Sequence, residues 1–205
     1  MVKTQAVTSS RTGRPRSEKT RLAILEATAD LLEETGFAAT TIEAIAAKAG
    51  VSKVTIYKWW PSRGSVAIDA FFLRYRQTIV FPDTGDVKED LSSQMLVLIA
   101  AFRDKAGQIM AELLAAAQFD KALAEELRIA WLQPRREVSR TVIQRGIDRG
   151  ELSPNIDIDI VLDGLYGPVY YRLVAGHRPL SDEFALELIN NVLNGVRLSD
   201  SDRKV

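Results

Sequence analysis

Apolar residues recur every three to four positions along most of the chain, a spacing that places them on one face of an α-helix. Gly, Pro and short polar runs interrupt the pattern where one helix is expected to end and another to begin. The interruptions leave helices that we expect at residues 17–34, 40–49, 53–60, 63–78, 88–105, 108–118, 121–149, 157–175 and 181–197. Pro134 should kink or divide the segment 121–149, because it removes a backbone donor. With no strand pattern and no clear repeat, the sequence predicts an all-α protein.

Residues 40–63 contain two short helices joined by a tight turn. Thr40 and Glu43 have the spacing of a capping box, in which each side chain accepts from the backbone N–H of the other residue. Gly50 can adopt the positive φ of the turn, Ser52 can cap the second helix, and Pro61 ends it. This is a helix-turn-helix, although a two-helix corner also occurs in all-α proteins that bind no DNA.

The second helix of the pair carries hydrogen-bond donors on its outer side. Val54 and Ile56 are expected to point inward. The outward donors suit phosphates and base edges: Ser52, Lys53, Thr55, Tyr57 and Lys58. The N-terminal part of a recognition helix meets base edges first, so Lys53, Thr55 and Lys58 are candidates for base contacts, whereas Tyr57 is placed for a phosphate.

The order of residues in this stretch adds a second argument. Thr-Thr-Ile, Ile-Ala, Ala-Gly-Val-Ser, Thr-Ile-Tyr, Trp-Trp and a basic residue three positions further on follow one another between residues 40 and 63. They resemble the DNA-binding signature of the tetracycline-repressor (TetR) family of bacterial regulators. Lys53 and Val54 stand where small residues are frequent in that family, and Trp60 stands where Phe is usual. Thr40 and Thr41 join the candidate DNA contacts. Arg63 begins the next helix, where the N-terminal amides also attract anions, so it is placed for a phosphate.

Residues 11–16, Arg-Thr-Gly-Arg-Pro-Arg, precede the first predicted helix. Gly and Pro disfavour a helix here, so we expect residues 1–16 to form a disordered basic arm. Gly-Arg-Pro resembles the centre of an AT-hook, and Arg14 and Arg16 are therefore candidates for the narrow minor groove of A·T-rich DNA. A solvated tail without a DNA role is the alternative.

Charge is unevenly distributed along a chain that is neutral as a whole. Residues 1–65 hold ten Lys and Arg against six Asp and Glu, a net charge of +4, which leaves −4 on residues 66–205. The basic end can therefore approach phosphate. The sequence has no Cys and only one His, His177, which excludes disulfides, zinc–thiolate sites and histidine metal clusters, and we expect no metal or cofactor. We find no apolar run suited to a signal peptide or membrane span and expect a cytoplasmic protein without a membrane partner.

The DNA-binding domain is expected at residues 17–62, and the helix at 63–78 leads from it into a second helical domain at 63–205. Residues 162–176, Pro-Arg-Arg at Pro134 and Arg-Gly-Glu-Leu at Arg149 look like the C-terminal domain of one TetR subgroup. The resemblance implies that this domain binds a small effector among its helices and dimerises through its last two helices. The aromatic residues that we place nearest the effector are Tyr75, Phe102, Trp131, Tyr166 and Tyr170. Core packing is the alternative for each of them.

The last predicted helix is apolar on more than one side, which exceeds what a single core-facing stripe needs. At the end of a chain, this pattern is expected where a partner subunit covers the helix. We therefore predict a homodimer interface at Leu188, Ile189, Val192, Leu193 and Val196. A two-fold dimer places two recognition helices about 34 Å apart. We therefore expect its operator to be a pseudopalindromic sequence of double-stranded DNA.

Together, these features predict a ligand-responsive DNA-binding transcriptional regulator, a repressor that a small-molecule effector releases from its operator. The alternative is a helical small-molecule-binding or interaction protein without a DNA role. The enzyme classes considered are disfavoured, because the chain has no Glu-x-x-His pair, no Gly-x-Ser-x-Gly elbow and no phosphate loop.

Overall fold

The computed structural model describes residues 14–75 and 82–196, and only the backbone of residues 14–16. Helices follow one another through the described ranges, which contain no strand. They are α1 (Arg14–Ala39), α2 (Ile42–Ala49), α3 (Lys53–Tyr57), α4 (Arg63–Tyr75), α5 (Val87–Phe102), α6 (Lys105–Ala117), α7 (Lys121–Leu127), the π-helical turn η2 (Arg128–Leu132), α8 (Gln133–Asp148), α9 (Ile158–Ala175) and α10 (Asp182–Val196). The predicted all-α fold is confirmed.

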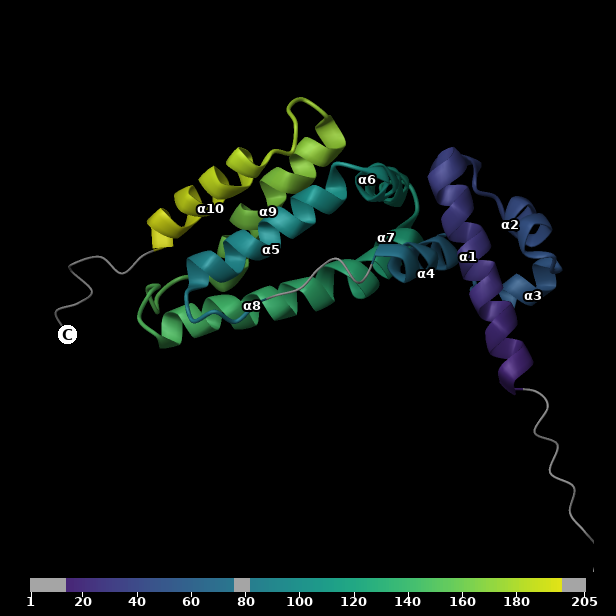
Figure 1. Cartoon of the computed structure of the whole chain (residues 1–205), viewed down its shortest axis with the longest axis horizontal. Helices are drawn as coiled ribbons and strands as arrows, with labels where there is room; N and C mark the ends of the chain where they lie inside the picture. Colours follow the sequence, from purple (N-terminus) through teal and green to yellow (C-terminus); the bar gives the residue numbers. More distant parts are fainter. Residues whose placement is uncertain (1–13, 76–81, 197–205) are drawn as a thin grey trace, which may run out of the picture.

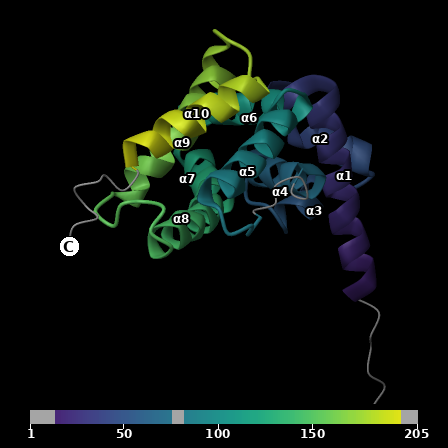
Figure 2. The same cartoon turned by 60° about the vertical axis from the view of Figure 1, so that its left-hand side comes forward.

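The helices form an elongated molecule with two ends of different construction (Figure 1). Helices α1, α2 and α3 form one end, and α4 leads from them toward the rest of the chain. Helices α5, α8, α9 and α10 run lengthwise through the other end, with α9 in contact with both α8 and α10 (Figure 2). Helices α6 and α7 connect the two ends, because α6 packs on α1 and α7 packs on α4. No helix in the described residues is both long and apolar enough to cross a membrane.

Helix α1 differs from its prediction at both ends. It begins at Arg14 rather than residue 17, so the predicted extended arm is wrong for residues 14–16; a Pro in the first helical turn is tolerated because its missing N–H would have no partner there. Residues 1–13 lie outside the described residues. Gly36 interrupts the helix with φ 78° and ψ 171°, and the backbone N–H of Phe37 donates to the Glu112 carboxylate on α6. The break in α1 is therefore held by a side chain from α6.

The cap of α2 lies one residue later than predicted. The Thr41 hydroxyl, rather than that of Thr40, accepts from the backbone N–H of Ala44, at 3.1 Å. Thr40 is fully buried and its hydroxyl donates to the Gly36 carbonyl at 2.7 Å, so it holds the end of α1 instead of starting α2.

This assignment predicts different effects for two replacements of Thr41. Thr41→Ala should lower the free energy of unfolding by about 1 kcal/mol, because an orphan N–H at the start of α2 loses its acceptor. Thr41→Ser keeps the acceptor and should retain most of the stability. Urea unfolding followed by circular dichroism measures both, and an equal loss in the two variants would contradict the capping role.

The segment 121–149 is divided as Pro134 predicts. Helix α7 passes through the π-helical turn η2 before α8 begins at Gln133, with Pro134 in its first turn. The π turn carries Trp131, which is 2 % exposed. The turn therefore places a large aromatic ring in the core between the two ends of the molecule.

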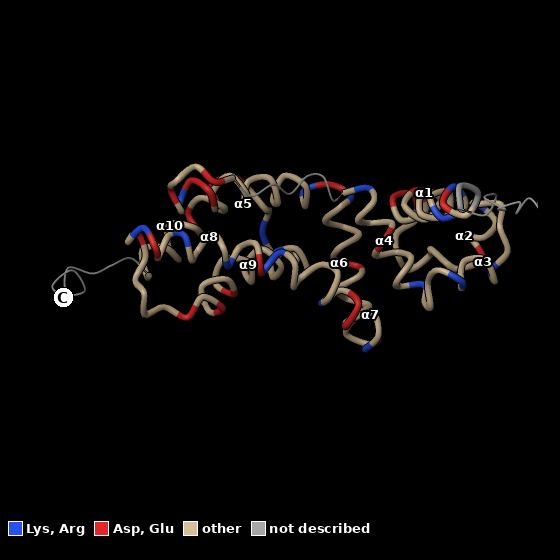
Figure 3. Tube along the Cα trace, turned by 90° about the horizontal axis from the view of Figure 1, so that it is seen from below, with Lys and Arg blue, Asp and Glu red and all other residues tan. Residues whose placement is uncertain are grey.

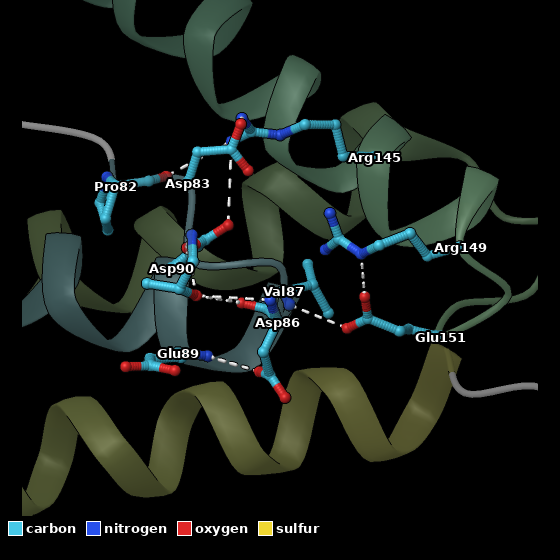
Figure 4. A network of polar contacts seen from close by, with 10 residues as sticks. Pro82, Asp83, Asp86, Val87, Glu89, Asp90, Arg145, Arg149 and Glu151 are labelled. Carbon is cyan, nitrogen blue, oxygen red and sulfur yellow. Dashed lines mark hydrogen bonds and ion pairs between the residues drawn. The ribbon is translucent and has the colours of Figure 1, made fainter.

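An ion-pair network around the buried Asp90 holds the start of α5 against α8 (Figure 4). Arg145 of α8 pairs with Asp83, and with Oδ2 of Asp90 at 3.8 Å. The Asp90 side chain is fully buried, and its Oδ1 accepts from the backbone N–H and the hydroxyl of Thr84, each at 2.8 Å. This network positions α5, which forms one wall of the cavity described below.

Candidate nucleic-acid interface and interior cavity

Helix α3 is presented to solvent by a turn whose parts follow the sequence prediction. Gly50 adopts φ 65°, and the Ser52 hydroxyl accepts from the backbone N–H of Thr55 at 3.2 Å. Ile56 is fully buried and anchors the helix on its inner side. Val54 is 67 % exposed, so its predicted inward position is wrong: Val54 and Ile56 are two residues apart, and a helix turns them to different sides.

The outer side of α3 carries basic and hydroxyl groups. Lys53 and Lys58 are exposed, and Tyr57 is 53 % exposed. Lys53 Nζ lies 2.9 Å from Glu43 Oε1 of α2, and this hydrogen bond raises the pKa of Lys53. Figure 3 shows Lys and Arg at this end of the molecule together with Asp and Glu, and further Asp and Glu on α7 and at one end of α5. The free surface of α3 is thus suited to an anionic partner.

A surface hollow joins α3 to the first turns of α1. Ser17 and Thr20 of α1 line it together with Thr55, Lys58 and Trp59. Hydroxyl and ammonium groups from two helices therefore converge within reach of one another. Ser17 and Thr20 were not among the predicted contacts, because they lie outside the helix-turn-helix and only the packing of α1 brings them to α3.

Two of the predicted contacts have partners within the protein. Thr40 is buried, as described above, so its side chain is not presented to DNA. The Arg63 guanidinium lies 4.1 Å from the centroid of the Phe37 ring and donates to the Phe37 and Ala38 carbonyls at 3.1 and 3.2 Å. Arg63 thereby caps the carbonyl end of α1. Thr41 remains exposed, and the Arg14 and Arg16 side chains lie outside the described residues.

A cavity of about 280 Å³ lies among α5, α8 and α9. Tyr166 and Tyr170 line it, as predicted, together with Gln94, Leu98, Leu132, Arg135, Arg136, Asp163 and Gly167. Phe102 and Trp131 do not line this cavity but stack behind it, with ring centroids 6.1 Å apart. Tyr75 is also absent from the lining, because its hydroxyl donates to Glu33 of α1 at 2.6 Å.

The polar groups at the cavity form one hydrogen-bonded set of three side chains and one hydrogen-bonded pair, each joining different helices. The Tyr166 hydroxyl donates to Oε1 of Gln94 at 2.9 Å and lies 2.9 Å from the Ser139 hydroxyl. The Tyr170 hydroxyl accepts from Nε1 of Trp131 at 2.7 Å. Burial raises the pKa of Tyr166 to about 12 and also raises that of Tyr170, so both phenols keep their protons at neutral pH. Gln94 and Ser139 were not predicted from the sequence, because only aromatic residues were considered as candidates for this site.

Trp131 connects this cavity to α4. Its ring lies 5.2 Å from that of Phe71 and 5.6 Å from that of Phe72, both on α4. The Arg135 guanidinium stacks on Trp131, 3.1 Å from the ring centroid, and also lines a second cavity between α1, α4 and α8. A shift in the position of Tyr170 can therefore be transmitted to α4 through the ring of Trp131 alone.

Helix α10 is covered partly by the chain itself. Ile189 is fully buried and Leu193 is 2 % exposed, both within the core that α10 shares with α5, so their predicted place in a dimer interface is wrong. Leu188, Val192 and Val196 are only partly buried. The sequence pattern did not separate the residues that face the core from those that remain accessible. Helix α5 buries the side chains that we had expected a partner subunit to bury.

Helix α9 carries an exposed row that the sequence analysis missed. Ile160, Tyr171 and Val174 are 69 %, 66 % and 56 % exposed. With Gly164 and Gly167 between them they follow spacings of four and three, which keep one face of a helix. Gly167 has open space beside it, which leaves room for a second helix, whereas Gly164 faces Val192 of α10.

Comparison with known proteins identifies relatives of both ends of the chain. Residues 24–68 match the family described as bacterial regulatory proteins of the tetR family, and residues 81–192 match the tetracyclin repressor-like C-terminal domain. The HTH-type transcriptional regulator YdeS of Bacillus subtilis (strain 168) is 39 % identical over 94 % of this chain and 97 % of its own length. The DNA-binding transcriptional repressor TetR of Mycobacteroides abscessus is 26 % identical over 87 % of this chain and 94 % of its own.

Solved structures agree with these relatives. The crystal structure of the TetR family transcription regulator SCO0332 is 38 % identical and superposes with a TM-score of 0.75, over 88 % of this chain and 100 % of that one. The fatty acid degradation regulator FadR from Bacillus halodurans, 19 % identical with a TM-score of 0.66 over 85 % of this chain and 98 % of that one, shares the fold.

Proposed function

Since this chain belongs to the TetR family and is a DNA-binding transcriptional regulator, we propose that it is a homodimeric repressor whose cavity binds a small molecule that releases it from DNA. The observation that carries the DNA-binding half is the exposed outer side of α3, held by Ser52 and Ile56. A regulator of this kind meets its operator in the cytoplasm, where we expect this chain to act.

We assign different DNA roles to the two sides of α3. Lys53 and Val54, at its exposed N-terminal end, are placed for base edges in the major groove, where a valine can contact a thymine methyl group. Tyr57, Lys58 and the hydroxyls of Ser17 and Thr20 are placed for phosphates. Thr41 and Thr55 flank these groups.

The two-fold partner is proposed to cover α9 and the adjoining side of α10. The exposed apolar row of α9 is next to Val192 of α10. A methyl carbon of Val192 lies 3.6 Å from the position that a Cβ atom would occupy at Gly164. Exposure of such an apolar row to water is unfavourable. The same row of a second copy can cover it, because a two-fold axis brings identical surfaces together. The dimer then presents two α3 helices to successive major grooves about 34 Å apart.

Release is proposed to act on the contacts that join the two ends of the molecule. A ligand touching Tyr170 acts on Trp131, and through it on Phe71 and Phe72 of α4. The Glu112 carboxylate forms a second link, because it accepts from Phe37 at the break in α1. The ligand can shift the protein away from DNA only by the difference in its affinity for the two conformations.

Binding-site selection from random duplex DNA, followed by fluorescence anisotropy, tests the regulatory function. We expect the selected pool to converge on an inverted repeat with half-sites one helical turn apart. A variant with Lys53→Ala and Val54→Ala is the matched control and should lose the preference. A pool that stays random, with equal affinity for every duplex, would instead favour a helical ligand-binding protein without a DNA role.

Separate replacements on α3 should distinguish base contacts from phosphate contacts. Lys53→Ala and Val54→Ala should each relax the preference at one operator position by about 1–3 kcal/mol. Lys58→Ala should weaken binding to all sequences alike and reduce the salt dependence by about one unit of slope. Anisotropy titrations on the operator, on single-base variants and at several salt concentrations measure these differences, and uniform weakening by all three variants would refute the assignment.

A further inference from the structure

We propose that the cavity among α5, α8 and α9 recognises an apolar small molecule by one acceptor oxygen, a carbonyl or carboxylate, through the Gln94 amide and the Tyr170 hydroxyl. The inference names the ligand class of the effector site, and it rests on the proposed function only for the step in which binding releases DNA.

Gln94 supplies the first donor. Its side chain is 1 % exposed, and its Oε1 already accepts from the Tyr166 hydroxyl at 2.9 Å. The Nε2 group, which can donate two hydrogen bonds, has no acceptor within the part of the chain that the structure describes. Because Gln94 lines the cavity, an oxygen atom of a ligand held there can accept from Nε2.

Tyr170 supplies the second donor. Its hydroxyl oxygen accepts from Trp131, whose indole N–H can only donate, so the phenolic proton is left for another acceptor. No residue in the described ranges accepts that proton. Burial keeps the phenol protonated by raising its pKa. Both groups line the same cavity, so a single oxygen can be reached from α5 and α9.

The remaining lining restricts the ligand further. Leu98, Leu132 and the two tyrosine rings form apolar walls, and 280 Å³ lies just below the range of about 300–1,000 Å³ that is usual for ligand pockets. Arg136 and Asp163 pair with each other at 2.5 Å, and Asp163 is largely exposed, so this pair belongs to the rim. Arg135 adds a positive charge to the wall, which disfavours a cationic ligand. A compact apolar body with one oxygen acceptor satisfies these conditions.

The test compares matched single-ring probes on the full-length protein by isothermal titration calorimetry. The probes are 3-phenylpropanoate, 4-phenyl-2-butanone, propylbenzene and 3-phenylpropylamine, which carry a carboxylate, a ketone, no acceptor and an ammonium group. We expect the carboxylate, the ketone or both to bind at millimolar concentration, and the hydrocarbon and amine to bind at least about tenfold more weakly. The ratio between the first two identifies which oxygen source the site prefers.

Variants assign the affinity to the two donors. Gln94→Leu and Tyr170→Phe, which keep the side-chain volume, should each weaken binding of the preferred probe by about tenfold. Gln118→Leu, at an exposed glutamine that does not line the cavity, is the control and should leave it unchanged. Equal or tighter binding of propylbenzene or the amine, binding of none of the probes, or unchanged affinity in both variants would overturn the proposal.

A parallel anisotropy titration on operator DNA separates this inference from the proposed function. Probes that bind with the expected acceptor preference but leave the DNA complex intact support the ligand class and contradict effector release. Release by propylbenzene as effective as release by the ketone, with no acceptor preference in calorimetry, contradicts the ligand class and leaves the repressor function standing.

Discussion

Tyr171→Asp should convert the protein to a monomer and weaken operator binding by at least about 100-fold, a loss of roughly 2.7 kcal/mol or more. Tyr171 is 66 % exposed on the same face of α9 as Ile160 and Val174. In a dimer that covers this face, the aspartate would be buried without a partner, whereas in a monomer it reaches water. Each monomer then contacts only one half-site, although α3 is unchanged.

Light scattering and anisotropy on the selected operator measure the two effects together. Phe119→Asp is the matched control, because Phe119 is also a large exposed apolar residue, at 95 %, in the turn between α6 and α7. It should remain dimeric and bind DNA normally. A dimeric Tyr171→Asp variant with full operator affinity would remove α9 from the interface.

Arg145→Ala should lower the free energy of unfolding by about 3 kcal/mol, because breaking a buried ion pair leaves a charge without compensation. Asp90 is the buried partner, with a fully buried side chain, and the Arg145 guanidinium is its ion-pair partner in the described network (Figure 4). We take the lower end of the usual range, since the Arg145 side chain is 29 % exposed and lies 3.8 Å from that oxygen.

Urea unfolding monitored by circular dichroism measures this loss, and Arg149→Ala is the matched control. Arg149 is about as accessible as Arg145, at 30 % against 29 %, but its partner Glu151 is 28 % exposed, whereas the side chain of Asp90 is fully buried. An accessible pair of this kind contributes about 0–1 kcal/mol. Equal losses in the two variants would show that burial of Asp90 does not set the energy of the network.

Periodicity predicted the helices well, because a helix that buries one face must repeat apolar residues every three to four positions. Their ends were harder to predict wherever neighbouring residues have the same chemistry. Thr40 and Thr41 can each accept from a backbone N–H, and only the burial of Thr40 beside Gly36 shows that Thr41 is the cap. Pro15 was taken as a helix breaker, although the first turn of a helix accommodates it.

The candidate sites divide in a similar way. Lys53, Tyr57 and Lys58 could be placed on the outside of α3 from sequence, because Ser52 and Ile56 set the phase of a short local element. The cavity could not be derived in full. Gln94 is separated by 72 positions from Tyr166, and no local pattern indicates that α5 and α9 bring them within 2.9 Å.

The amino-acid sequence by itself determined the helical class, the helix-turn-helix and the family, since these depend on spacings within one or two turns of the chain. Packing between distant helices determined which apolar residues are covered and which polar groups meet. Ile189 and Leu193 carry the same kind of side chain as Ile160, yet within one chain α5 packs against α10 and buries the first two, whereas Ile160 stays exposed. The apolar character of a side chain means that its burial is favourable. Only the tertiary arrangement determines which surface buries it.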